Sequence, residues 1–523
     1  MGDFGLSRLR AWGRDFGRYV AGTVLVGVLA YFGMMAEELN NHHDGIWHLS
    51  NFIAGDFEIS LGRAMERYTD RLRFGIVSSP LNILFCLLLL GVANSLIIRR
   101  FRLERTFYAW LVVFLFTVNP VMGDTFSYSY LAVNYLMACL FAVVAFYLLS
   151  ETGSDGGRAR VIRVCLAAVA VTLSMSHFQA YFSLLCTLLL CYGIRQLLMG
   201  TEWRILKKYY LDSLLGILLG GVCYLAFTKL MLLHADTVMA DYKGASGINP
   251  LTILLALPAS VVHCYQEAFA YVFRYHFWTD LEFARILALL LTAAFAVAVV
   301  ASGIRLFRES RTHFAAYVCS VLLLPVAGNA VLLIAVGNVM TGLMAAGLLA
   351  IVILFPIMMP EKGIRGIPCR SICLAILVLF GWYALAAVTN DQLALREGRT
   401  ATVTLAEQIV SKLYEGDYLT QERTVAFIGR PGNNPYFAHS YAFEHANEYA
   451  QFGYWSTDPR NNRVSWYGVL TGYVGVTLPL CDDETFDQLR QTSLVAEMPV
   501  FPADGSITVK DNVVLVKVSD LYE

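Results

Sequence analysis

Residues 81–98 read LNILFCLLLLGVANSLII, and Arg99 and Arg100 follow them directly. No side chain in this stretch carries a charge. A transmembrane helix needs about 20 predominantly apolar residues, and lysine and arginine gather on its cytoplasmic side. The stretch therefore predicts a membrane-spanning helix whose C-terminal end faces the cytoplasm.

The composition extends this interpretation to the whole chain. Of the 523 residues, 57% are hydrophobic and only 15% are charged, whereas soluble domains carry about 25% charged residues. The formal net charge of −1 offers no basic surface for nucleic acid. The 11 cysteines form no Cys-x-x-Cys pair and no Cys/His spacing typical of zinc. We therefore expect an all-α, multi-pass membrane protein without a metal or a cofactor.

Hydropathy predicts about eleven transmembrane helices. The two that begin at 106 and 161 are short, so they are expected to be tilted, broken or partly interfacial. The predicted spans are 19–35, 77–98, 106–121, 130–149, 161–174, 180–198, 211–233, 281–304, 314–336, 341–360 and 371–388.

Positive charge alternates between the connections of these spans. The N-terminus and every second connection are rich in arginine and lysine, as at Arg99, Arg100, Arg102 and Arg105. The other connections carry almost none, except for four arginines in the first one. The positive-inside bias then predicts a cytoplasmic N-terminus, and eleven spans predict an exterior C-terminus.

Three large pieces of the chain are expected outside. They are the first loop, 36–76, a segment at 234–280, and the tail, 389–523, which follows a transmembrane domain at 1–388. The part at 250–280 is too polar for a span and indicates one or two interfacial helices. The tail is predicted to be a small α/β domain with a strand at 424–428, a helix at 486–490 and a hairpin formed by 506–509 and 513–518.

The first loop opens with an unusually polar stretch that includes Glu38, His43 and Asp44. Polar groups this dense at a membrane exit are costly unless they are used or solvated. Asp44 could serve as a general base that accepts a hydroxyl proton during group transfer. The alternative is an ordinary solvated carboxylate.

The same loop carries Arg63, Arg67 and Arg71 at intervals of four residues, which would form one stripe on a helix. Because arginine binds phosphate oxygens in a fixed fork, the stripe could hold a phosphate or pyrophosphate. The alternative is an interfacial helix that contacts lipid headgroups.

Two later exterior turns bring further polar residues. Asp124 could converge with Asp44 over one cavity, or it could cap the next span. His177 and Gln179 lie in the following turn, where a single histidine is more often structural than catalytic.

The order of these motifs resembles the type II serotype-converting O-antigen glucosyltransferases, a bacterial and phage family of polytopic membrane proteins. The similarity covers most of the chain. Three departures are His43 where the family usually has an acid, Ala64 where it has tryptophan, and Asp124 where a glutamate is expected one or two positions away. The stretches that carry the resemblance are His43-Asp44, Gly62-Arg63, Ser79-Pro80-Leu81, Asn119-Pro120, Phe126-Ser127-Tyr128, Ser176 to Ala180, Phe427-Ile428-Gly429 and Pro499 to Ile507.

The resemblance implies a GT-C-like hexosyltransferase in the bacterial inner membrane, with a periplasmic tail. Its donor would be a polyprenyl-phosphate sugar, with undecaprenyl-phosphate glucose expected, and its acceptor a surface polysaccharide or lipid-linked glycan. Asp44 would be the base, with Asp124 as a second catalytic carboxylate, and Arg63 or Arg67 would stabilise the leaving phosphate. The remaining substrate-binding residues would be Glu38, His43, Arg71, His177 and Gln179.

Two other classes remain open. A flippase or transporter would carry ionisable residues near the middle of its spans, whereas here Asp212 and Lys229 lie towards helix ends. A polysaccharide polymerase or ligase would share the lipid-linked substrate and the exterior site.

Overall fold

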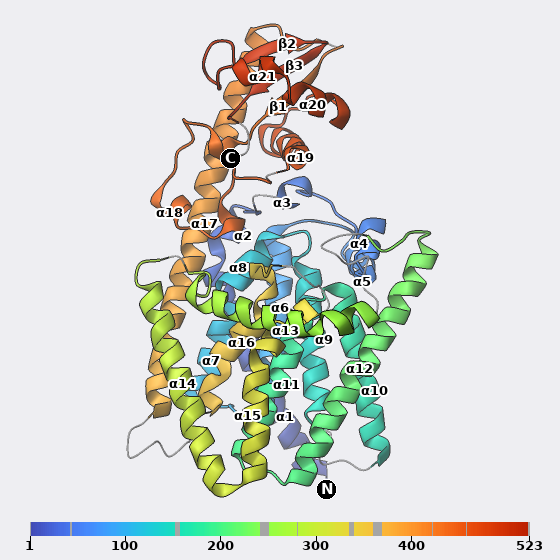
Figure 1. The fold of residues 1–523 in the computed structure, drawn as a ribbon, viewed down its shortest axis with the longest axis vertical. Coiled ribbons are helices and arrows are strands. Elements are labelled where there is room, and N and C mark those ends of the chain that lie inside the picture. The colour runs from blue at the N-terminus through green and yellow to red at the C-terminus, as the bar shows by residue number, and fades with distance from the viewer. Residues whose placement is uncertain are drawn as a thin grey trace.

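A computed structural model describes residues 2–41, 44–151, 157–240, 250–279, 281–333, 339–358, 369–420, 422–456 and 458–520. The chain forms a bundle of long helices, and the C-terminal tail is stacked on one end of this bundle (Figure 1). The N-terminus lies at the opposite end of the bundle, so one end carries the tail and the other carries the N-terminus.

Among the described residues, eight helices are long and apolar enough to cross a membrane. A ninth span is obtained if the bent pair α7, Phe107–Thr117, and α8, Pro120–Ser127, counts as one. The membrane class and the helical fold are therefore confirmed. The eight helices are α6 Ser79–Arg100, α9 Ala132–Leu149, α10 Gly157–His177, α11 Tyr181–Leu198, α12 Trp203–His234, α14 Ala284–Glu309, α15 Arg311–Gly328 and α17 Cys369–Glu415.

The difference from eleven predicted spans lies in three segments. The first, α1 Gly2–Ala30, carries several charges in its N-terminal half, and the short α2 Phe32–Ala36 follows it. The second is the α7–α8 pair. The third, the 341–360 region, is divided into short helices: η4 Gly342–Met344, α16 Ala346–Leu354 and η5 Phe355–Met358.

The break between α7 and α8 has a local cause. The two helices meet at an angle of 41°. Pro120 lacks a backbone N–H and forces the preceding residue into extended conformation, and Asn119 has φ −164° and ψ 160°. The Asn119 side chain then accepts a hydrogen bond from the Met122 backbone N–H and so begins α8. The predicted span at 106–121 is therefore broken, as its short length indicated.

The first loop folds as short helices between α2 and α6. They are α3 Asp44–Trp47, α4 Asp56–Ser60 and α5 Ala64–Leu72. We call the end of the bundle that carries residues 36–76 the loop end. We call the opposite end, where α6 finishes at Arg99 and Arg100, the arginine end.

Between the loop end and the middle of the bundle, α13 Pro250–Phe273 lies across the neighbouring helices rather than along them (Figure 1). One helix forms in this region, within the one or two predicted for 250–280, and its interfacial position stays a prediction. The 3-10 helix η3 Ala330–Leu333 packs against α13.

The longest helix, α17, joins the bundle to the tail (Figure 1). Its 47 residues give a length of about 70 Å, more than twice the hydrocarbon thickness of a membrane. The helix therefore continues without interruption through the predicted boundary between the transmembrane domain, 1–388, and the tail, 389–523. The tail then contributes η6 Pro431–Asn433, α18 Tyr441–Glu444, η7 Glu448–Ala450, α19 Pro459–Val469, η8 Leu470–Val474, α20 Asp483–Arg490 and α21 Ser493–Glu497.

A three-stranded sheet with the order β1-β3-β2 lies at the top of the tail. The strand β1 Thr424–Ile428 runs parallel to β3 Val513–Lys517, and β2 Ile507–Lys510 pairs with β3 antiparallel. Asp511 and Asn512 form the hairpin turn with φ values of 50° and 62°, which suits these residue types. The predicted strand and hairpin are therefore confirmed.

Candidate functional site

Asp44 is the first residue of α3, at the loop end. The turn before it is fixed by Asn41, whose side chain accepts a hydrogen bond from the Gly45 backbone N–H at 2.8 Å. The Asn41 backbone N–H in turn donates to the Ser127 carbonyl at 3.0 Å. The position of Asp44 is thus tied to the end of α8. Glu38 lies upstream with its side chain exposed, and His43 is outside the described residues.

Arg63 occupies the N-cap position of α5. Its Nε donates to the Gln179 Oε1 at 3.4 Å, and its guanidinium lies 4.8 Å from the centre of the Phe178 ring. Gln179 is itself held, because its Nε2 donates to the Leu61 carbonyl at 2.8 Å and to the Tyr224 hydroxyl at 2.9 Å. Of the predicted residues, Arg63 and Gln179 are therefore in direct contact.

The position before Arg63 requires a glycine, Gly62. Its φ is +76°, a left-handed conformation that costs other residues energy. A Cβ at this position would also lie 2.4 Å from the Tyr224 hydroxyl. The Gly62-Arg63 pair thus lets the chain turn closely under Tyr224 and present Arg63 to Gln179.

The three arginines predicted as one stripe have different environments. Arg67 forms an ion pair with Asp56 at 2.6 Å and donates to the Ala54 carbonyl at 3.0 Å. Arg71 is exposed. Arg63 precedes the first turn of the helix instead of lying on its side, so its contacts differ from those of the other two.

Glu66 is the most unusual charged residue of the first loop. Its side chain is completely buried, and neither carboxylate oxygen has a hydrogen-bond partner among the described residues. Burial raises the pKa of Glu66 well above its usual range, and the nearby charge of Arg63 opposes this rise. The carboxyl group therefore favours its protonated form more than an ordinary glutamate does.

Asp70, one turn further along α5, is also buried but fully engaged. It accepts hydrogen bonds from the Ala54 backbone N–H at 2.9 Å and from Asn134 at 2.9 Å, and it pairs with Arg73 at 2.8 Å. Burial raises the pKa of Asp70, and these partners oppose the rise. Asp70 therefore serves to fasten the loop to α9.

An aromatic layer lies beneath the first loop. Tyr130 is 4.7 Å from Phe52 and 4.8 Å from His48, measured between ring centres. Tyr135 is 4.3 Å from Phe178, the ring under Arg63. Aromatic faces with hydroxyl groups at their edges suit a ligand that has both apolar and polar faces.

The first loop contacts this layer at two points. His48, which follows α3, lies against Tyr130, and Arg63 lies over the Phe178 ring. Tyr128 joins the two parts of the layer, with ring centres 6.4 Å from Tyr130 and 6.2 Å from Tyr135. We take Asp44, Arg63 and Glu66 of the first loop, together with this layer, as the candidate site.

Asp124 lies inside α8 and is buried, so it does not cap the next span. Its carboxylate accepts a hydrogen bond from the Leu343 backbone. A Cβ on Gly342 would lie 2.4 Å from Asp124 Oδ2, which shows how closely η4 covers this carboxylate. Asp124 is thus enclosed between α8 and η4.

His177 is buried at the end of α10. Its Nδ1 donates to the Leu173 carbonyl at 2.8 Å, so in the neutral ring Nε2 accepts from the Thr69 hydroxyl at 3.0 Å. These contacts fasten α5 to α10 and agree with the structural alternative for this histidine.

The tail covers the loop end from above. Trp47 Nε1 donates to Ser465 Oγ of α19 at 3.0 Å, and Arg399 of α17 pairs with Glu37 at 3.2 Å. Deeper in, the Tyr449 hydroxyl of the tail donates to Asp391 of α17 at 2.6 Å. The tail is thus anchored on both sides of the candidate site.

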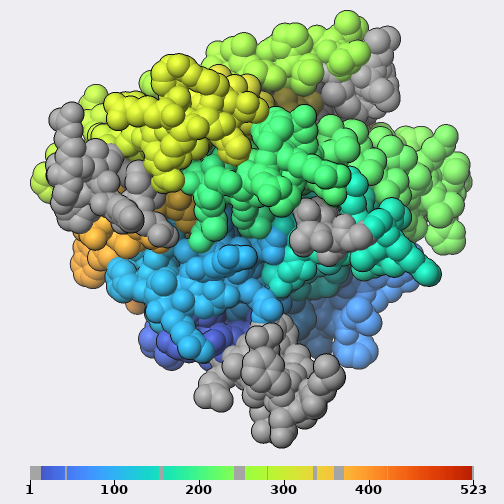
Figure 2. Space-filling model, turned by 90° about the horizontal axis from the view of Figure 1, so that it is seen from below, coloured from blue at the N-terminus to red at the C-terminus, as the bar shows by residue number. Residues whose placement is uncertain are grey.

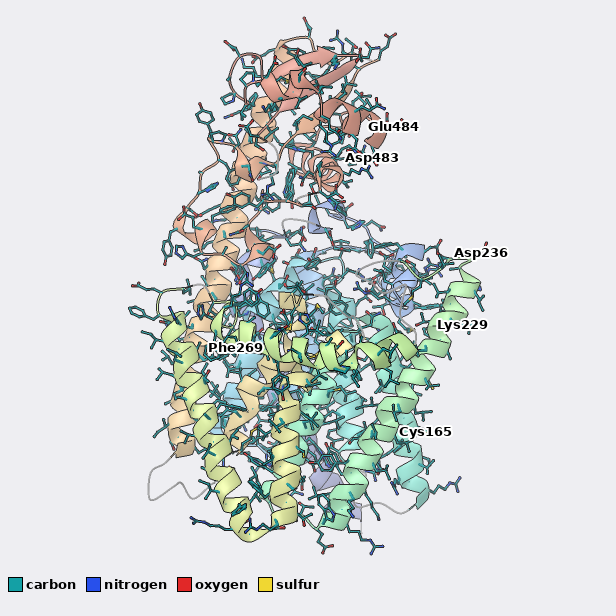
Figure 3. The ribbon with its side chains drawn as sticks, viewed as in Figure 1. Cys165, Lys229, Asp236, Phe269, Asp483 and Glu484 are labelled. Carbon is teal, nitrogen blue, oxygen red and sulfur yellow. The ribbon has the colours of Figure 1, made fainter. Side chains whose placement is uncertain are left out.

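Charges on the spans themselves lie away from this group. Asp212 pairs with Arg160 of α10, and Lys229 lies near the loop end of α12, close to the exposed Asp236 (Figure 3). Within the described residues, no group of three His, Cys, Asp or Glu side chains could hold a metal ion.

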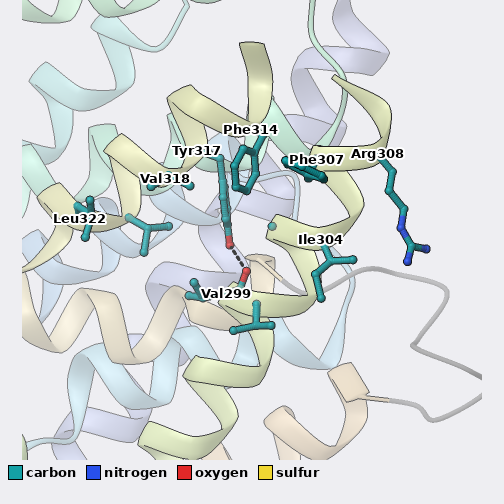
Figure 4. A pocket seen from close by; sticks show the side chains of 11 residues that line it. Val299, Ile304, Phe307, Arg308, Phe314, Tyr317, Val318 and Leu322 are labelled. Atoms are coloured by element: carbon teal, nitrogen blue, oxygen red, sulfur yellow. Dashed lines mark hydrogen bonds between the residues drawn. The ribbon is translucent and has the colours of Figure 1, made fainter. Parts of the chain in front are cut away.

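A separate apolar groove of about 590 Å³ runs between α14 and α15. Val299, Ile304, Phe307 and Leu322 are among its lining residues, and the Tyr317 hydroxyl donates to the Val299 carbonyl at 3.1 Å (Figure 4). The groove lies towards the arginine end and contains none of the candidate-site residues.

Fold and site together define a multi-pass membrane protein whose candidate site lies at one end of a helical bundle, under an α/β tail. A sequence profile described as "Glucosyl transferase GtrII" matches residues 43–360, more than half of the chain. The chain belongs to this family, and it is a membrane glucosyltransferase. The searches of curated proteins and of solved structures each found no match. The profile match includes Asp44, Arg63, Glu66 and Asp124, and it confirms the resemblance stated from the sequence.

Glu66, Tyr130 and Tyr135 were not singled out from the sequence. The only signal for Glu66 was its place beside the arginines. The two tyrosines belong to an apolar stretch with many aromatic residues, and nothing in their spacing separates them from packing residues.

Proposed function

We propose that the protein transfers glucose from a polyprenyl-phosphate donor to a surface polysaccharide such as O-antigen, on the periplasmic face of the bacterial inner membrane. The observation that carries this proposal is that the first loop, which includes Asp44 and Arg63, contacts one aromatic layer at the loop end, in a glucosyltransferase family. A GT-C-like arrangement, with the site outside the membrane and under an exterior tail, is part of the same proposal.

The chemistry would be a single displacement. The acceptor hydroxyl oxygen attacks the anomeric carbon as the bond from that carbon to the phosphate oxygen breaks. Asp44 takes the hydroxyl proton, and the leaving group departs as polyprenyl phosphate. The negative charge that develops on the phosphate needs a fixed positive partner, and Arg63 supplies it. The step is redox-neutral, so it needs no oxidant or reductant.

Arg63 is preferred to Arg67 for this role because it lies over the Phe178 ring of the aromatic layer and is held there by Gln179. Gln179 would act as a positioning residue, since it holds the Arg63 side chain. The proposal also accounts for Glu66, because burial raises the pKa of this carboxyl and so disfavours the negative charge that would compete with the phosphate for Arg63. Glu38, His43, Arg71, His177 and Asp124 remain predicted contributors around this centre.

The test is glucose transfer by the purified, full-length protein, supplied with polyprenyl-phosphate glucose and a polysaccharide acceptor. Asp44→Asn should lower the rate by about 10²–10⁴-fold, the usual cost of losing a general base. Asp236→Asn is the matched control, because Asp236 is exposed at the same end and asparagine tolerates its φ of 48°. Near-normal transfer by Asp44→Asn would remove this residue from the mechanism, whereas movement of the lipid-linked sugar without transfer would favour a flippase.

The predicted orientation has its own test. A reporter that is active only outside the cytoplasm should be active when fused after Glu523 and silent when fused after Arg102. The reverse pattern would move the candidate site to the cytoplasmic face and remove the lipid-linked donor from the proposal.

A further inference from the structure

A polar cavity lies at the arginine end, far from the candidate site. Its volume is about 470 Å³. Five helices or their ends contribute to its wall. The lining residues are Arg100, Arg102, Ser150, Glu151, Arg163, Tyr192, Gln196, Thr201, Ile205, Leu206 and Tyr209. The helix α6 runs from the first loop to this cavity, and its 22 residues separate the two sites by about 33 Å.

The wall of this cavity is strongly positive. Among the described lining residues there are three arginines and one carboxylate, Glu151. Arg100 and Arg163 approach Glu151 at 3.4 Å and 3.5 Å, distances longer than the 2.7–2.9 Å typical of a strong charge-assisted hydrogen bond. The buried Nε of Arg100 has no partner among the described residues. The described lining therefore carries three guanidinium groups and one carboxylate, an excess of positive charge.

The orientation of Arg100 is fixed by an aromatic neighbour. Its Nη2 donates to the Tyr192 hydroxyl at 2.8 Å, and its guanidinium lies 4.7 Å from the centre of the same ring. Arg195 lies on α11, as Tyr192 does, and donates to the Phe101 carbonyl, so the turn after α6 is fastened to α11. Figure 2 shows this end of the molecule, with the segment near residue 100 in blue beside the segment near residue 200 in green.

Residue types that are common at the headgroup level of a membrane lie beside the cavity. Trp203 begins α12 next to the lining residues, and Lys207 lies over its ring at 5.6 Å. Tryptophan and lysine are enriched where a span meets water. Ile205, which lines the cavity, is 38% exposed, so the opening has an apolar side as well.

We propose that this cavity binds a phosphate-bearing anion and so holds the ends of α6, α10 and α11 together. Arginine forks match phosphate oxygens, and basic cavities between membrane helices suit acidic lipid headgroups. An anionic phospholipid of the membrane and free inorganic phosphate share this chemistry. The site is independent of the transfer reaction, so the two proposals can fail separately.

The test uses full-length protein in detergent with three probes: phosphatidylglycerol, zwitterionic phosphatidylcholine and inorganic phosphate. Native mass spectrometry counts bound lipid, and the melting temperature is measured with each probe. We expect phosphatidylglycerol to bind and to raise the melting temperature, and phosphatidylcholine to do neither. A response to inorganic phosphate that matches that of the lipid would assign the site to a soluble anion instead.

Variants locate the effect. Arg163→Gln should weaken phosphatidylglycerol binding by roughly tenfold or more. Arg308→Gln, an exposed arginine on α14 at the same end, should leave it unchanged. If Arg163→Gln fails to fold, Arg102→Gln replaces it, because Arg102 is exposed and has no ion pair in the described part of the chain. Equal binding by Arg102→Gln, Arg163→Gln and the unaltered protein would overturn the proposal.

Discussion

Replacing Arg63 with lysine is the most informative perturbation of the candidate site. Lysine keeps the positive charge but loses the planar fork. It would also lose the Nε contact to Gln179 and the flat contact with the Phe178 ring, which together hold the guanidinium in place. We therefore expect Arg63→Lys to weaken use of the donor while leaving use of the acceptor almost unchanged.

The size of the effect follows from the surroundings of Arg63. Two opposite charges about 4 Å apart attract by about 4 kcal/mol when the effective dielectric constant is about 20. Desolvation and side-chain entropy reduce the net value of a charge-assisted contact to about 1.5–3 kcal/mol, so Arg63→Ala should lose roughly ten- to hundredfold. Arg63→Lys should fall between the alanine variant and the unaltered protein. The assay is initial-rate kinetics in detergent with the polyprenyl-phosphate sugar varied at fixed acceptor.

A matched control separates this loss from a general effect of arginine replacement. Arg105→Lys changes a surface arginine, 70% exposed and paired with Asp15, where an ion pair contributes little. Unchanged donor kinetics in Arg63→Lys would refute the phosphate role. The arginines of the first loop would then be an interfacial anchor, and any defect should follow the lipid composition.

Three further predictions concern the support of this arginine. Gly62→Ala should destabilise the first loop by at least the 1–2 kcal/mol of a left-handed alanine, with a lower melting temperature and slower transfer; a fully active, equally stable variant would contradict the role of the close turn. Gln179→Ala should raise the KM for the donor more than it lowers kcat, and a change in kcat alone would show that Gln179 does not position Arg63. Glu66→Gln should raise the melting temperature near pH 8 and flatten its dependence on pH. Burial raises the folded-state pKa of Glu66. As the pH rises above the usual glutamate range, the unfolded chain therefore releases this proton first, and the stability of the folded protein falls. An unaltered pH profile would show that Glu66 is not held in this way.

Much of the fold could be predicted from hydropathy, because spans such as α6 and α9 are long and nearly free of charge. The hairpin in the tail was predictable for a similar reason, since Asp511 and Asn512 are the residue types that its turn requires. The number of spans was harder to predict. An apolar segment that is interrupted, as at Pro120 or within 341–360, has the composition of a span but not its continuity.

The candidate site was predictable only in part. Sequence spacing makes Arg63, Arg67 and Arg71 equivalent, because they recur every four residues. The structure separates them because α5 begins at Ala64, so Arg63 belongs to the preceding turn and its direction is set by Gly62. A helix boundary of this kind depends on tertiary contacts, here with Tyr224 and Gln179, that no local pattern contains.

Glu66 shows why such contacts carry information about function. A carboxyl group that is buried without a hydrogen-bond partner costs free energy, and a leucine or methionine of similar volume would avoid this cost. Its neighbour Asp70 is buried to the same degree but has three partners, so Asp70 is explained by the fold alone. Glu66 is not, and it is near enough to Arg63 for that charge to oppose the rise in its pKa. The proposed mechanism gives this acid a role that packing does not, because burial disfavours a negative charge that would compete with the phosphate for the arginine.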